Sequence, residues 1–502
     1  MDQCGSIERE AFVSLSTPRI RRSRAAISAL LGLLLLVNLA TSLYQLPLNR
    51  VVESRLCRDY YREKEPSRFG PDDSISEDLC KLDDVQKSLA WIQGAMDTAW
   101  IIGDFVMTIP LGFMAEKYGQ RAVLWLNIAP RVFMLSWAVM VGYFDQLFPT
   151  KAIIAGPFLS VFGGDCVFNS MTYALAAGIT DDYVLRATYF GWMSSVSYVV
   201  ALLGPALASA TMTVMLWLPF FIGIILLALA VPAITLLPDH PHTADANVFG
   251  NQEEVLSHPL ISSPLLKAQT LETSALQAIS MRFGELSSIL ASHPRNLTLL
   301  FISFFLTSLA SSDTKLLVQY ISKRYHWSFA SAGYLLSSKA VMNFVLLTVI
   351  IPWVLRSRHT RSLRSSSPVS TDRANLRYAQ LCLAISVIGA LAIGLASELW
   401  FLIPSLLLYA LGSALPVFTL SLLKSSAIAP EEYSNPKSTD VETHLFSITM
   451  MIKTLGSLVG APLMAALWIR GISLGDAALG VPYFTSSASY AAAMLVLSKI
   501  RA

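Results

Sequence analysis

The sequence predicts an all-α polytopic membrane protein with twelve transmembrane helices arranged as two bundles of six. Three observations lead to this fold class. The chain of 502 residues is 54% hydrophobic and only 14% charged, whereas soluble domains carry about 25% charged residues. Several apolar runs reach the roughly 20 residues that a helix needs to cross a bilayer. The longest internal polar stretch, 238–297, divides these runs into two sets of equal number.

The apolar runs define the predicted spans in chain order. They lie at 26–46, 88–114, 122–144, 151–177, 187–210, 214–237, 298–321, 330–355, 378–396, 399–423, 443–468 and 481–498. The predicted domains are an N-terminal tail (1–25), a first bundle (26–237), a linker (238–297) and a second bundle (298–502). The linker contains LLKAQTLETSALQAISMRFGELSSIL, whose apolar spacing fits either an amphipathic helix on the membrane surface or a solvated connection.

Lysine and arginine gather in the predicted loops on one side of the bilayer. The N-terminal segment PRIRRSR (Pro18–Arg24) and the loop 356–377 are the most basic of these segments. The positive-inside rule therefore predicts that both termini are cytoplasmic. The run at 26–46 is too long for a cleavable signal peptide and lacks a small-residue cleavage site. The net charge is +3, and the basic residues are spread over loops, so the sequence gives no reason to expect a nucleic-acid partner.

Two of the five cysteines, Cys57 and Cys80, fall in the first predicted outer loop, 47–87. This loop faces an oxidising environment in the predicted orientation, which favours a disulfide that braces it. Two free thiols are the alternative. Neither interpretation gives the cysteines a chemical role.

A cluster of glycines and charges, GFMAEKYGQR, lies in the short predicted turn between the second and third spans. One interpretation is a simple cytoplasmic anchor, because charges are tolerated where a helix leaves the membrane. The spacing offers a second one. Positions Gly112, Glu116, Lys117, Gly119 and Arg121 follow G-x-x-x-[D/E]-[R/K]-x-G-x-[R/K].

This pattern resembles motif A of the major facilitator superfamily, with Glu116 where aspartate is usual and Gln120 where a basic residue is usual. The resemblance implies two six-helix bundles around a central site. It also implies that the acid of the motif engages basic groups and a helix N-terminus of the other half, which holds the cytoplasmic side closed. An anion at a helix N-terminus contributes about 0.3–1 kcal/mol, which suits a contact that must open again.

Further fragments agree with the resemblance. ITDDYVLRATYFG places Asp181 and Arg186 where the family has an acid followed by an arginine. Gly204 and Pro205 match the core of motif C of proton-driven drug exporters, although a tolerated proline kink explains them equally well. CRDYY, LCKLDDVQKSLAWIQG and VQYISKRYHWSFASAGYLLSSKA are similar to a fungal branch that is distantly related to the proton-coupled folate transporter family.

Ionisable residues within predicted spans are candidates for proton coupling or substrate binding. A charge at the centre of a span costs about 2.5–3.5 kcal/mol on insertion scales, so such residues need a partner or a function. The candidates are Asp97, Asp104, Arg131, Asp165, Asp313, Lys315, Lys339 and Lys453.

Depth along the spans predicts how these charges pair. Asp104 and Arg131 lie at similar depths in consecutive spans, and Asp313 could pair with Lys339. Such pairs either fix helix packing or carry a proton. Asp165 has the fewest cations near it in the sequence and is the first choice for the proton carrier.

These features predict a secondary transporter of a small organic compound, driven by the proton gradient and working as a monomer in the plasma membrane. Export of a metabolite or toxic compound is favoured by the motif C fragment, and uptake of a nutrient by the folate-transporter similarity. A non-transporting sensor with the same fold is the third possibility. We expect no bound cofactor, metal or enzymatic activity, since the chain has no Walker A, HExxH or GxSxG pattern.

Overall fold

The computed structural model describes residues 4–64, 75–179, 183–237, 295–346, 368–422, 439–475 and 478–500. Helices make up most of these residues, and no β-strand occurs among them. The N-terminal half contains α1 (Cys4–Lys64), η2 (Glu77–Cys80), α2 (Asp83–Tyr118), α3 (Gln120–Tyr143), η3 (Thr150–Phe162), α4 (Asp165–Gly178), α5 (Tyr183–Val214) and α6 (Leu218–Thr235). The C-terminal half contains α8 (Arg295–Ser311), η5 (Ser312–Lys315), α9 (Leu317–Arg324), α10 (Phe329–Val345), α12 (Pro368–Leu395), α13 (Leu399–Leu411), η7 (Gly412–Ala414), α14 (Leu415–Leu422), α15 (Thr439–Leu474) and α16 (Val481–Ser498).

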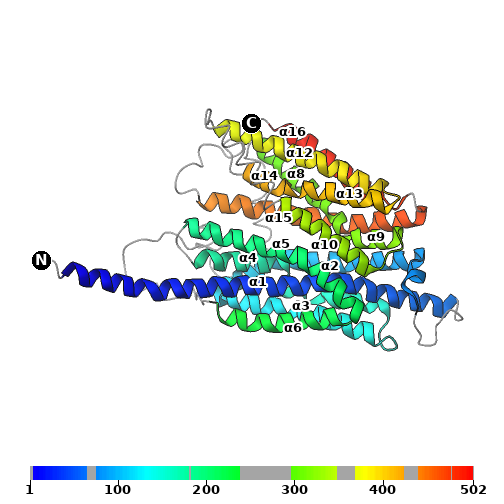
Figure 1. Cartoon of the computed structure of the whole chain (residues 1–502), viewed down its shortest axis with the longest axis horizontal. Coiled ribbons are helices and arrows are strands. Elements are labelled where there is room, and N and C mark those ends of the chain that lie inside the picture. The colour runs from blue at the N-terminus through cyan, green and yellow to red at the C-terminus, as the bar shows by residue number, and fades with distance from the viewer. Residues whose placement is uncertain are drawn as a thin grey trace.

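The long helices run roughly side by side along the long axis of the molecule (Figure 1). Large apolar side chains such as Ile225, Leu229 and Trp400 are exposed on the outside. Lipid is the solvent that such a surface requires. The prediction of an all-α membrane protein is therefore confirmed.

Eight described helical stretches are long and apolar enough to span a membrane. They are Arg24–Lys64, Gln120–Tyr143, Thr150–Ala176, Gly191–Val214, Leu218–Thr235, Arg295–Lys315, Asn375–Leu395 and Thr449–Leu474. The predicted span 88–114 lies in α2, which carries Asp97 and Asp104. The predicted span 399–423 begins in the short apolar helix Leu399–Ala414. The total of twelve spans stays a prediction. The predicted linker falls outside the described residues up to position 294.

Two predicted spans are interrupted. The span at 151–177 consists of the 3₁₀ helix η3 and the α-helix α4, separated by Gly163 and Gly164. Gly163 has a φ of +115°, a conformation that side chains other than glycine rarely adopt. The span at 298–321 is interrupted by the 3₁₀ turn η5. Interruptions of this kind release backbone groups and place polar residues inside a bundle.

The two halves pack against each other through α2 with α15 and through α5 with α10. A Cβ on Gly94 of α2 would lie 2.6 Å from Cβ of Ala465 in α15, and one on Gly333 of α10 would lie 2.1 Å from Oγ of Ser209 in α5. Small residues thus let the backbones of the two halves approach closely.

Candidate functional site

A buried arginine organises the interior of the N-terminal half. The Arg131 side chain on α3 is 1% exposed. Its Nη2 donates to Oδ1 of Asp165 at 2.8 Å, its Nη1 to Oγ1 of Thr41 at 2.9 Å, and its Nε to Oδ1 of Asn127 at 3.2 Å. The guanidinium also lies 5.8 Å from the ring centroid of Trp100. Arg131 therefore joins α1, α3 and α4 at one point.

Asp165 is more than half exposed although it is paired with this buried arginine. Its side chain has a relative exposure of 56%, and Nε1 of Trp100 on α2 donates to its Oδ2 at 3.4 Å. Asp165 has few cations near it in the sequence, and its cationic partner Arg131 comes from a different span. An exposed acid with a fixed cationic partner is available to a polar ligand.

Asp104 does not pair with Arg131, which corrects the predicted ion pair. Its carboxylate accepts hydrogen bonds from the backbone N–H groups of Gly164 at 3.1 Å, Cys166 at 2.8 Å and Val167 at 3.4 Å. The break at Gly163 and Gly164 starts α4 inside the bundle, so its first N–H groups need acceptors. Asp104 caps this helix from a neighbouring span, which is a structural role.

Replacing Asp104 by alanine should lower the free energy of unfolding of the detergent-solubilised protein by about 1–3 kcal/mol, because it leaves buried N–H groups without an acceptor. Chemical denaturation followed by tryptophan fluorescence would measure this loss. Asp84→Ala is the matched control, because Asp84 is exposed and its nearest cation is 3.8 Å away. Equal stability of the two variants would contradict the capping role.

Polar contacts also cross between the halves near the middle of α2. Nζ of Lys315 on η5 lies 3.3 Å from Oδ1 of Asp97 on α2, and Nε2 of Gln319 on α9 donates to Oε1 of Gln93. The structure thus brings two predicted candidates, Asp97 and Lys315, together across the interface between the bundles. Separation of the halves would break this pair.

In the C-terminal half, Asp313 and Lys339 interact electrostatically, but not as the predicted close ion pair. Asp313 accepts from the hydroxyl of Tyr409 on α13, and no ion pair within 4 Å joins it to Lys339 among the residues described. Nζ of Lys339 lies 5.0 Å from the centroid of the Tyr409 ring. Lys453 lies on α15, where its carbonyl oxygen accepts from the hydroxyl of Ser308.

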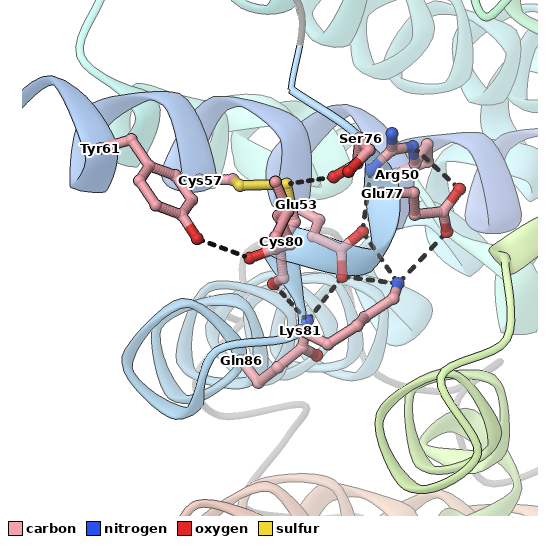
Figure 2. The surroundings of a disulfide bond; sticks show 10 residues. Arg50, Glu53, Cys57, Tyr61, Ser76, Glu77, Cys80, Lys81 and Gln86 are labelled. Atoms are coloured by element: carbon pink, nitrogen blue, oxygen red, sulfur yellow. Dashed lines mark hydrogen bonds and ion pairs between the residues drawn. A yellow bond between two sulfur atoms is a disulfide. The ribbon is translucent and has the colours of Figure 1, made fainter. Parts of the chain in front are cut away.

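A disulfide joins Cys57, near the C-terminal end of α1, to Cys80 at the end of η2, with 5.2 Å between their Cα atoms. Figure 2 shows the polar residues around it. Five of them, which we call the disulfide cluster, are Arg50, Glu53, Glu77, Lys81 and Gln86. We call the end of the molecule that contains these five residues the disulfide end.

A buried ion pair lies at the centre of the disulfide cluster. Nζ of Lys81 lies 2.8 Å from Oε1 of Glu53, and the two side chains are 1% and 0% exposed. Lys81 also contacts Oε1 of Glu77 at 3.2 Å, while Arg50 and Gln86 donate to Glu53 at 3.0 Å and 2.6 Å. The sequence does not predict this cluster, because the segment 47–87 reads as a loop.

The disulfide cluster also contacts the other half of the molecule. The N–H of Phe329, the first residue of α10, donates to Oε1 of Glu77 at 2.9 Å. The Lys81 ammonium lies 4.4 Å from the centroid of the Phe329 ring. Next to it, Nζ of Lys323 lies 2.6 Å from Oδ1 of Asp83. The cluster therefore connects the halves at the disulfide end.

The glycine-rich turn at 112–121 lies at the opposite end of the molecule. Gly119 separates α2 from α3 with a φ of +89°. Arg121 donates to the carbonyl oxygens of Ile234 and Thr235 at the C-terminal end of α6, a favourable place for a cation. The side chains of Glu116 and Lys117 lie outside the described residues, as does the predicted contact of the acid with the other half.

The remaining predicted residues lie in α2, in α5 or outside the described part of the chain. Gly112 is buried on α2, and Arg186 lies on α5 with its side chain outside the described part. Asp181 also lies outside it. Gly204 and Pro205 lie within α5, where a Cβ on Gly204 would lie 2.0 Å from Oγ of Ser42. This glycine permits a close approach of α1 and α5. The described residues contain no group of three or more His, Cys, Asp and Glu arranged to hold a metal.

Comparison with known proteins gives a family and several relatives. The family model of the Major Facilitator Superfamily matches residues 88–461. The chain is 27% identical to the MFS efflux pump atnC of Emericella nidulans, over 97% of this chain and 90% of that protein. It is 24% identical to the efflux pump ustT of Aspergillus flavus, over 88% of this chain and 81% of that protein.

Solved structures resemble the whole chain. A D-xylose–proton symporter superposes with a TM-score of 0.56 at 14% identity, covering 96% of this chain and 98% of that one. The human organic anion transporter TETRAN superposes with a TM-score of 0.55 at 15% identity, covering 95% and 99%. At these identities the likeness concerns the fold.

Proposed function

Because the chain belongs to the major facilitator superfamily, we propose that it exports a small organic compound across the plasma membrane in exchange for protons. Two observations support export. Fungal relatives that match almost the full length are named as efflux pumps. Gly204 and Pro205 of the motif C fragment lie where α5 packs closely against α1. The resemblance to the proton-coupled folate transporter family stays a prediction.

The observation that carries the proposal is the pairing of charges where the two bundles face each other. The Asp97–Lys315 pair bridges the halves, and the Arg131–Asp165 pair presents an acid with 56% of its side chain exposed. Charges are expensive inside a membrane protein unless they are paired or functional. We place the compound between the bundles, at Asp165 and Trp100.

We further propose that the disulfide end faces the outside of the cell and acts as the outer gate. Disulfides form in oxidising environments, and the predicted orientation places this end opposite the cytoplasmic termini. The contacts of Glu77 and Lys81 with Phe329 hold the halves together there. Alternating access requires that these contacts break when the central site opens to the outside.

Export predicts a difference in accumulation between two otherwise identical fungal strains. Cells that lack the gene should retain a metabolite that wild-type cells release, and a protonophore should make wild-type cells retain it as well. Untargeted mass spectrometry of cells and medium measures both effects. Release that persists with the protonophore would contradict proton coupling, and higher intracellular levels in wild-type cells would indicate uptake.

A further inference from the structure

The 3₁₀ turn η5 interrupts the predicted seventh span and carries an acid and a base that contact different halves. Asp313 is 0% exposed and contacts residues of the C-terminal half. Lys315, two residues later, reaches across to Asp97 of the N-terminal half. The turn η5 thus places a buried acid of the C-terminal half two residues from an ion pair between the bundles.

Two tyrosine hydroxyls form a chain that ends at the Asp313 carboxyl group. The hydroxyl of Tyr409 lies 3.0 Å from Oδ1 and 3.2 Å from Oδ2 of Asp313. The hydroxyl of Tyr490 on α16 lies 3.1 Å from that of Tyr409. A hydroxyl can both donate and accept, so this chain can stabilise either an ionised or a neutral carboxyl group.

The charged and titratable groups around Asp313 come from several elements. They are Lys339 on α10, Tyr409 on α13, and Tyr483 and Tyr490 on α16, together with Lys315 on η5 itself. Lys339 lies over the Tyr409 ring, with no ion pair to Asp313 within 4 Å in the described part of the chain. Lys315 forms its ion pair with Asp97 of α2.

The other acids of the predicted spans have cationic or backbone partners. Asp97 has Lys315 at 3.3 Å, Asp165 has Arg131 at 2.8 Å, and Asp104 accepts three backbone N–H groups. Asp313 differs from Asp97 and Asp165 because it is completely buried, forms no ion pair within 4 Å among the described residues, and accepts from the hydroxyl of Tyr409. A buried carboxylate without a paired cation is costly, and removal of its charge relieves that cost.

We propose that the carboxyl group of Asp313 takes up and releases the transported proton. This inference rests on the proposed proton coupling and moves the carrier from Asp165 to the other half of the molecule. In the step, the carboxylate gains one proton from water and becomes neutral. Its new O–H donates to the Tyr409 oxygen, and the Tyr409 hydrogen turns towards Tyr490. No proton is lost from either tyrosine.

Infrared difference spectroscopy of the purified full-length protein in detergent tests this without a substrate, because the proton is the probe. Spectra are recorded during a titration from alkaline to acidic buffer. A neutral carboxyl group gives a C=O stretching band that a carboxylate lacks. We expect the difference between wild type and Asp313→Asn to contain one such band. Asp165→Asn should retain it, since Asp165 is held by Arg131.

Tyr409→Phe provides the second variant, in case Asp313→Asn does not fold. Loss of the tyrosine hydrogen bond should move the band to higher frequency. Size-exclusion profiles identify folded variants. A band that survives in Asp313→Asn, or one that Tyr409→Phe does not move, overturns the proposal. Loss of the band in Asp165→Asn assigns the proton to Asp165 instead. The spectra do not depend on export, so a failure of the cellular experiment would contradict the proposed function alone.

Discussion

Replacement of Lys81 by methionine should lower the free energy of unfolding by about 3–5 kcal/mol, the cost of removing one partner of a buried ion pair. Glu53 would keep its carboxylate at 0% exposure with only Arg50 and Gln86 as donors. The contact of Lys81 with the Phe329 ring would be lost as well. Denaturant unfolding of the detergent-solubilised protein, followed by tryptophan fluorescence, measures the change.

Lys64→Met is the matched control for this variant. Lys64 and Asp84 are 3.8 Å apart with side-chain exposures of 55% and 63%, and exposed pairs contribute about 0–1 kcal/mol. The double variant Lys81→Met with Glu53→Gln should recover part of the lost stability, because it removes the buried carboxylate that has lost its lysine partner. If Lys81→Met were no less stable than Lys64→Met, the cluster would not be a buried ion pair in solution.

Hydropathy alone predicted the all-α membrane fold, because a helix in lipid must be apolar over most of its surface. It did not predict where α1 ends. A search for apolar windows stops at the charges Arg50 and Glu53, yet the helix continues to Lys64. Glu53 is buried beside Lys81, and Arg50 pairs with Glu77; both partners come from a later segment of the chain. A single sequence gives no signal for such long-range compensation.

The partner of Arg131 was missed for a local reason. Depth along two straight helices placed Asp104 opposite Arg131, but the fourth span is not straight. The adjacent glycines Gly163 and Gly164 were the available signal, since a pair of glycines favours a break in a helix. A helix that begins after them needs an acceptor for its first N–H groups, and Asp104 is used for that purpose.

Tyr409 was missed for a different reason. It lies in the apolar run LWFLIPSLLLYAL and contributes to hydropathy like its neighbours. Its hydroxyl becomes significant only when the fold brings it to Asp313 of η5. Buried tyrosine hydroxyls usually have a partner, so a tyrosine within a span could have been paired with an intramembrane acid in the same half.

Arg131→Met should reduce export by about tenfold or more. It removes three hydrogen bonds of the guanidinium, which join α1, α3 and α4. It also leaves the Asp165 carboxylate without its cation. Arg131→Lys should be intermediate, since an ammonium keeps the charge but cannot reproduce the planar guanidinium geometry. Export of the metabolite identified by the comparison of strains, divided by the amount of protein at the cell surface, measures the effect.

Arg58→Met separates the proposed role of Arg131 from the general loss of an arginine. Arg58 pairs with Asp145 at 3.0 Å, where both side chains are about one-third exposed, so its replacement should change export by less than about threefold. Combining Arg131→Met with Asp165→Asn then tests the charge itself. If the unpaired carboxylate blocks transport, the double variant exports more than Arg131→Met. If both export equally little, the hydrogen bonds of Arg131 to α1 and α3 limit the cycle. Undiminished export by Arg131→Met would remove this pair from the transport site.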